Sequence, residues 1–132
     1  MDKKAIIPPD RQSYYSDWHF APAILSGGFL FVSGCTGASP DGSLPRSPEA
    51  QVRQAFANVG TVLAEAGADF GDVVEMTSYH VGLLDHLDLF RRVKDDYIAE
   101  PYPAWTAIGV SELAAPGALI EIRVTAKQPS NR

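Results

Sequence analysis

The spacing of apolar residues predicts two helices, and the first is the more strongly marked. Between residues 48 and 66 apolar side chains recur every three or four positions and form one stripe along a helix. Ser47 can accept a hydrogen bond from a free amide at its start, Pro48 suits its first turn and Gly67 suits its end. The stripe consists of Val52, Ala55, Phe56, Val59, Val62, Leu63 and Ala66.

A second helix is expected from Asp85, as its N-cap, through Ile98. Asp88 can pair with an arginine one turn further along this helix. Pro101 and Pro103 cannot continue a helix and end it. Its buried stripe consists of Leu87, Phe90, Val93 and Tyr97, which recur every three or four positions.

Shorter apolar runs with many β-branched and aromatic residues predict strands at 23–25, 29–33, 73–81, 104–110 and 118–126. Gly27 and Gly28 suit a tight hairpin between the first two of these strands. Phe29–Val32 is apolar at every position, which is typical of a strand covered on both faces. In the third strand, alternation places four residues on one side: Val74, Met76, Ser78 and His80.

The remaining segments are predicted to be irregular. Residues 1–19 are polar and interrupted by proline, so we expect an N-terminal arm on the surface of the domain. Proline, glycine and serine dominate residues 36–48, which are expected to form a loop near a site. The domain itself then covers residues 20–128, and residues 129–132 form a C-terminal tail.

This order of elements predicts an α+β domain with a mixed sheet and two helices packed on one face. Because two helices cover only one side, the other face of the sheet needs a different cover. Further copies of the same chain are the most economical cover, so we expect a homo-oligomer whose clefts lie between subunits.

Composition and charge narrow the range of functions. The chain has 132 residues, enough for one domain, and a net charge of −5 from 16 acidic and 11 basic residues, which disfavours binding of nucleic acid. One cysteine and three histidines lack the spacing of a zinc site, so no metal is expected. Residues 20–34 are broken by Pro22 and glycines, and no signal peptide is evident, so we expect a cytoplasmic protein without a membrane partner.

Candidate chemistry centres on Glu121. Alternation in the last strand places Glu121 on the side opposite Ile120 and Ile122. In a partly dry cleft its pKa would rise, and the carboxylate would deprotonate a water and return the proton to a leaving group. The competing interpretation is a solvated or interface charge, because structural charges outnumber catalytic ones.

Three further residues have a functional and a structural interpretation. Gly34, after Ser33, allows a ligand to approach backbone amides, or is only a strand exit. Cys35 is a candidate nucleophile but lacks a nearby histidine, so a small buried hydrophobe is the better interpretation. Trp105 is either a stacking wall for a planar ligand or a core or contact aromatic.

The chain resembles the RidA/YjgF/YER057c family of small imine and enamine deaminases. The resemblance spans residues 20–127, and the order and spacing of its segments are more specific than any one of them. The segments that carry it are Phe29–Cys35, Gln54–Val59, Ala64–Ala68, Val73–Thr77, Tyr102–Thr106 and Pro116–Ile122.

This resemblance implies a chorismate-mutase-like fold, a homotrimer with ligand clefts between subunits, and chemistry without a cofactor. In the best-known branch an arginine holds the substrate carboxylate, and a glutamate in the last strand positions the water that hydrolyses the imine. Glu121 matches that glutamate, and Ser33 and Gly34 match a serine-glycine pair whose following amides assist binding.

The chain also departs from the family pattern. Trp105 occupies the position of the arginine, and Ala107 replaces a frequent cysteine. Phe20 replaces a tyrosine that often lines the cleft. Arg91 aligns with an asparagine of the second helix, so it either supplies charge to the cleft or is an exposed residue paired on its own helix. A larger, flatter or less acidic substrate than the short 2-imino acids fits these changes better.

The favoured function is therefore hydrolytic deamination of a reactive imine or enamine, such as an aminomuconate-like dienamine, with Glu121 as the acid-base group. The alternative is a non-catalytic member that binds a small metabolite in the same cleft. A ribonuclease or translation inhibitor is disfavoured by the acidic charge and by the absence of basic clusters.

Overall fold

The computed structural model describes residues 2–129, and its six strands form one mixed sheet. The strand order is β1-β2-β3-β6-β4-β5, and all neighbours are antiparallel except β4 and β5. The strands are β1 (Lys4–Ile6), β2 (Ala23–Ser26), β3 (Phe29–Cys35), β4 (Val73–His80), β5 (Ala104–Gly109) and β6 (Ile120–Lys127). The helices are α1 (Gln12–Ser16), α2 (Pro48–Glu65) and α3 (Leu83–Lys94), with 3₁₀ turns at Pro9–Arg11 and Phe70–Asp72.

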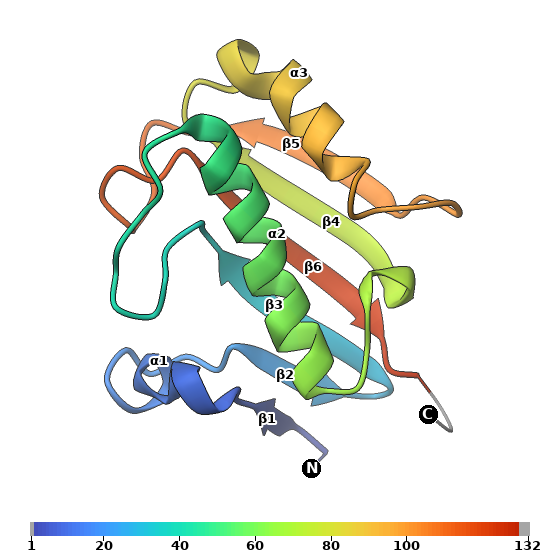
Figure 1. Ribbon diagram of the computed structural model, residues 1–132. Helices are drawn as coiled ribbons and strands as arrows, with labels where there is room; N and C mark the ends of the chain where they lie inside the picture. The colour runs from blue at the N-terminus through green and yellow to red at the C-terminus, as the bar shows by residue number, and fades with distance from the viewer. Residues whose placement is uncertain (1, 130–132) are drawn as a thin grey trace.

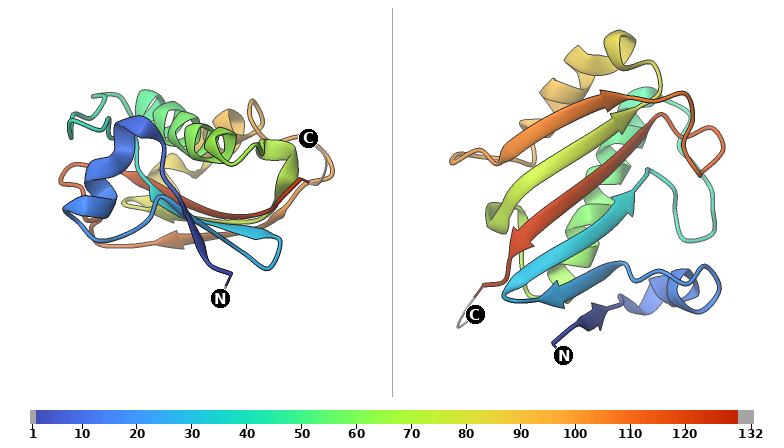
Figure 2. Two further views of the ribbon diagram at one scale, coloured as in Figure 1. Left: turned by 90° about the horizontal axis from the view of Figure 1, so that it is seen from below. Right: turned by 180° about the vertical axis from the view of Figure 1, so that it is seen from behind.

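The two long helices, α2 and α3, lie side by side on one face of the sheet (Figures 1 and 2). None of the helices in residues 2–129 covers the other face, which lies open in the rear view of Figure 2. The predicted α+β class and the two helices on one face of a mixed sheet are therefore confirmed. Residues 2–129 contain no helix that is both long and apolar enough to cross a membrane.

Helix α2 forms as predicted and supplies the centre of the core. The Ser47 hydroxyl accepts a hydrogen bond from the Ala50 amide at 3.0 Å, and Gly67 takes the left-handed conformation after the last turn. Phe56 is fully buried and stacks on Tyr97 with 4.9 Å between ring centroids, and it also contacts Phe90. These aromatic contacts join α2 to α3 and hold both helices on the sheet.

Helix α3 differs from its prediction at both ends. It begins at Leu83, after Gly82 in the left-handed conformation, so Asp85 lies in the first turn and is not the N-cap. It ends at Lys94, and the chain reaches Ile98 through irregular turns. On this helix Arg92 pairs with Glu49 of α2 at 2.9 Å rather than with Asp88. A glycine N-cap has no side chain that could mark the start of the helix, so the sequence pattern favours the polar Asp85 as the cap.

The strands show two departures from simple alternation. In β3, Leu30 and Val32 are buried while Phe29 and Phe31 are 40% and 44% exposed, so the prediction of a strand covered on both faces is wrong for the single chain. In β4, the pairing with β6 shifts between Val73 and Glu75. This irregularity buries Val73 and leaves Val74 exposed, against the prediction. From Met76 onward the predicted alternation is confirmed, and His80 packs edge-on against a core phenylalanine.

The N-terminal arm is part of the sheet rather than laid on its surface. Residues 4–6 pair antiparallel with residues 23–25 as the edge strand β1. The chain then turns through Pro9–Arg11 and α1, which lie beside the end of β2 and β3 (Figure 1). A three-residue strand is too short to show a period of its own, so no pattern of residues predicts it. Most of the predicted tail, residues 130–132, lies outside the described residues.

Candidate functional site

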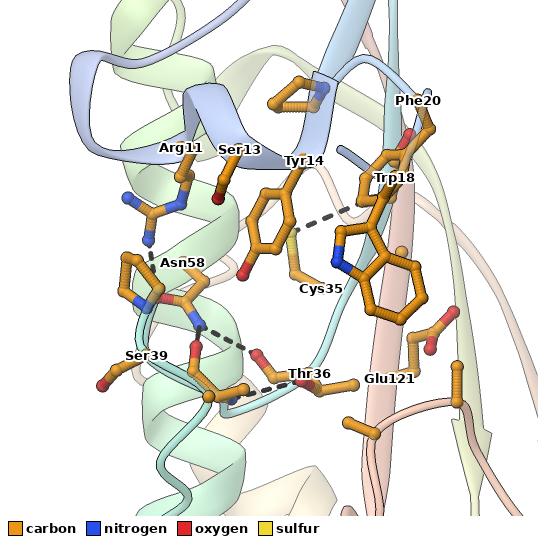
Figure 3. A pocket seen from close by; sticks show the side chains of 18 of the residues that line it. Arg11, Ser13, Tyr14, Trp18, Phe20, Cys35, Thr36, Ser39, Asn58 and Glu121 are labelled. Atoms are coloured by element: carbon orange, nitrogen blue, oxygen red, sulfur yellow. Dashed lines mark hydrogen bonds between the residues drawn. The ribbon is translucent and has the colours of Figure 1, made fainter. Parts of the chain in front are cut away.

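A cavity of about 460 Å³ opens where the arm, β3, α2 and β6 meet (Figure 3). This volume lies within the range of small-molecule sites. Five of the candidate site residues border it: Phe20, Ser33, Gly34, Cys35 and Glu121. The other polar and aromatic residues of its wall include Arg11, Ser13, Tyr14, Trp18, Thr36, Ser39, Asp41 and Asn58.

Glu121 and Gly34 are in direct contact in this wall. Val32 of β3 lies opposite Val124, but Cys35 lies opposite Ile122, so β3 carries one extra residue in the interval that contains Gly34. A Cβ atom on Gly34 would overlap the Oε2 atom of Glu121 and lie 2.6 Å from its Cδ atom. Any side chain at position 34 would displace this carboxylate from its position, which gives Gly34 a role beyond that of a strand exit.

Burial changes the acidity of Glu121. Its side chain is half-buried, and desolvation raises the pKa of its carboxyl above the usual value of 4.5. A raised pKa brings a carboxyl closer to the range in which it exchanges protons at neutral pH. The structure therefore places at the cavity wall a carboxylate suited to both accepting and returning a proton.

Ser33 and Cys35 have less freedom for chemistry. The Ser33 hydroxyl donates to the Ala21 carbonyl at 2.7 Å, so its proton is used to join β3 to the preceding segment. The Cys35 thiol donates to the Ser33 carbonyl at 3.5 Å, and burial raises its pKa to about 12. Such a thiol stays protonated at neutral pH, which favours its interpretation as a small buried residue over a nucleophile.

The arm contributes residues that sequence reasoning missed. Tyr14 and Phe20 stack with 5.3 Å between ring centroids, and the Trp18 side chain is 71% exposed at the cavity. Arg11 is almost fully buried, and its guanidinium donates to Asn58 of α2 at 2.9 Å. The polar, proline-interrupted pattern of residues 1–19 is typical of a surface segment and does not predict that Arg11 lies in a site. The aromatic residues of the arm were the one available signal.

Three candidate residues lie away from this cavity in the single chain. The indole N–H of Trp105 donates to the Ser78 hydroxyl at 2.9 Å, and its ring packs on Phe90 under α3. Ala107 pairs with Ser78 on the neighbouring strand, and Arg91 is exposed on α3. Their part in a cleft between subunits stays a prediction.

Metal ligands do not gather at the cavity or elsewhere in residues 2–129: no three side chains of His, Cys, Asp or Glu lie close enough to hold an ion. The raised pKa of the Cys35 thiol also disfavours the thiolate that metals bind.

Residues 11–128 match the model of a protein family described as endoribonuclease L-PSP. The chain belongs to this family. It includes the RidA and YjgF proteins that the sequence motifs resemble, so the family resemblance is confirmed.

Relatives within the family carry different names. The chain is 39% identical to the RutC family protein YjgH of Escherichia coli over 98% of both chains, and a solved structure of protein YjgH superposes with a TM-score of 0.88. It is 32% identical to a 2-iminobutanoate/2-iminopropanoate deaminase of Bos taurus over 83% of this chain and 80% of the relative. The RidA structure from an Antarctic Psychrobacter superposes with a TM-score of 0.83 at 26% identity over 94% of this chain and 99% of that one. The family therefore includes imine deaminases.

The contact between Gly34 and Glu121 generates a test. Gly34→Ala is expected to lower the free energy of unfolding by about 0.5–1.5 kcal/mol, because its methyl group pushes the Glu121 side chain out of its position. Gly109→Ala is the matched control, since a Cβ atom there meets its nearest neighbour, Leu83, at an ordinary 3.5 Å. Denaturant unfolding of both variants provides the measurement.

The same substitution in a Glu121→Ala chain tests whether the carboxylate causes this loss of stability. In a Glu121→Ala chain the obstructing carboxylate is gone, so Gly34→Ala is expected to cost less than half as much as in the wild type. An equal cost in both backgrounds, or a cost no greater than that of Gly109→Ala, would show that the contact does not constrain position 34.

Proposed function

We propose that the protein is a hydrolytic deaminase of a reactive imine or enamine, with Glu121 as the acid-base group. The observation that most supports this proposal is the half-buried carboxylate of Glu121, which lies against Gly34 at the wall of a cavity. Support comes from the family, which includes imine deaminases.

The reaction needs two proton movements. Glu121 removes a proton from a water molecule while the water oxygen bonds to the imine carbon, and it returns that proton to the nitrogen, which gives a neutral carbinolamine. Glu121 then takes the proton of the carbinolamine hydroxyl and delivers it to the amine nitrogen as the carbon–nitrogen bond breaks and the carbonyl forms. One imine and one water thus yield one carbonyl compound and one ammonia, and the carboxylate is regenerated.

The residues that line the cavity indicate the size and shape of the substrate. Phe20, Tyr14 and Trp18 supply aromatic surface along one side, and the wall as a whole is mostly apolar. Trp105 stands where the resemblance implies an arginine, and it is bound within the fold to Ser78. These features favour a larger and flatter substrate than the short 2-imino acids.

A metabolite-binding protein without turnover is the second candidate, and the tryptophan at position 105 favours it. It uses the same cavity and differs only in the absence of product. An endoribonuclease, the activity in the family's description, receives less support, because the chain carries a net charge of −5.

The proposed assembly is a homotrimer in which copies cover the open face of the sheet. Exposed apolar side chains on that face, Phe29, Phe31 and Ile108, are each at least 40% exposed in the single chain. Sedimentation at micromolar concentration is expected to give the mass of three chains, and Phe31→Glu is expected to lower that mass. A stable wild-type monomer would contradict the assembly.

Turnover tests the proposed chemistry. Purified protein is expected to accelerate ammonia release from freshly generated imines and from 2-aminomuconate. Glu121→Gln is expected to lower kcat/KM at least about 100-fold, because general acid-base catalysis contributes 10²–10⁴-fold.

Glu112→Gln serves as the matched control, since it removes an exposed carboxylate that does not border the cavity. Its activity is expected to equal that of the wild type. Unchanged turnover in Glu121→Gln would refute the role of Glu121. Binding of these compounds without ammonia release would favour the metabolite-binding function.

A further inference from the structure

Arg11 is a buried cation without a buried ion-pair partner among residues 2–129. It ends the turn Pro9–Arg11, only 7% of its surface is exposed, and it borders the same cavity as Glu121. Placing a guanidinium out of water is costly unless charged partners compensate it. The partners of Arg11 therefore show whether its charge serves the fold.

Within residues 2–129, Arg11 uses two of its five N–H groups in hydrogen bonds between side chains. One goes to Asp10, at 2.8 Å, whose carboxylate side chain is 61% exposed. Water screens such an exposed partner, so this pair offsets little of the cost of burial. The other goes to the neutral Asn58 amide oxygen at 2.9 Å.

Asn58 does not depend on Arg11. Its amide oxygen also accepts from Gln54 at 3.0 Å, and its amide nitrogen donates to the carbonyl oxygens of Thr36 and Ala38 at 2.9 and 2.8 Å. The tie between α2 and the loop after β3 therefore persists without the arginine. Neither the hydrogen bond to the neutral Asn58 nor the pair with the exposed Asp10 requires a buried positive charge, so the charge is available for another purpose.

The geometry of the cavity indicates that purpose. Figure 3 shows Arg11 beside α2 and Glu121 on β6, with Tyr14 and Trp18 drawn between them. The Cys35 thiol is influenced by the charges of both Arg11 and Glu121, which places both within electrostatic reach of one point in the wall. A ligand in this cavity meets a cation, flat aromatic surfaces and a carboxylate.

We propose that Arg11 binds the carboxylate of a ligand whose flat body lies along Tyr14, Trp18 and Phe20. A guanidinium with free N–H groups matches a carboxylate in charge and in planar geometry. The reacting carbon of a 2-imino acid is bonded directly to that carboxylate, so Arg11 holds it in the cavity that Glu121 borders. The ligand class is an aromatic or conjugated 2-imino acid and its 2-keto acid product, a designation that rests on the proposed function.

Equilibrium binding tests Arg11 separately from turnover. The probes are phenylpyruvate and phenylacetone, two ketones with the same aromatic ring, of which only the first carries a carboxylate. Calorimetry on the full chain is expected to show that the wild type prefers phenylpyruvate. Arg11→Gln is expected to raise the Kd for phenylpyruvate at least 10-fold and to change the Kd for phenylacetone less than twofold. The Kd of Arg11→Lys for phenylpyruvate is expected to lie between those of the wild type and Arg11→Gln.

The control is Arg53→Gln, which removes an equal charge from α2 at a residue outside the cavity wall and is expected to change neither affinity. Three results would overturn the proposal: no preference for the acid in the wild type, equal weakening of both probes in Arg11→Gln, or an unchanged affinity for phenylpyruvate in that variant. Because no turnover is measured, Arg11 can fail while the deaminase stands, and the reverse also holds.

Discussion

The close approach of β3 to Glu121 is the constraint on which the site depends. Glu121 on β6 lies against β3, and the extra residue in β3 together with Gly34 leaves space for its carboxylate. The carboxylate is thereby held half-buried at a cavity, and burial raises its pKa. Gly34 thus leaves space for the carboxylate in this position, and burial in this position raises its pKa.

Charge is distributed across the cavity rather than concentrated at one point. Arg11 enters from the arm and Glu121 from the sheet, and the thiol of Cys35, which responds to both, stays neutral. The arm reaches this position because β1 anchors it to the edge of the sheet and Arg11 contacts Asn58 of α2. An edge strand of three residues thus anchors the segment that brings Arg11, Tyr14 and Trp18 to the cavity wall.

Much of the fold was predictable from the sequence because α2 and β6 have strong periodic patterns of buried residues. The start of α3 was not predictable, since Gly82 precedes the helix in a left-handed conformation and Asp85 is a residue type that often forms an N-cap. At the site, Glu121 and Gly34 stand out in a strand and at a strand end. Arg11 was missed because its burial arises from contacts with Asn58, 47 positions away, which no local pattern records.

The pH dependence of kcat/KM for ammonia release, corrected for spontaneous hydrolysis, tests the central claim most directly. Glu121 must be deprotonated to take a proton from water, and desolvation raises its pKa. The rate is therefore expected to be full at high pH and to fall as pH drops through a midpoint above 4.5, the ordinary value. A flat profile, or a midpoint at or below 4.5, would contradict the assignment of Glu121 as the proton-transfer group.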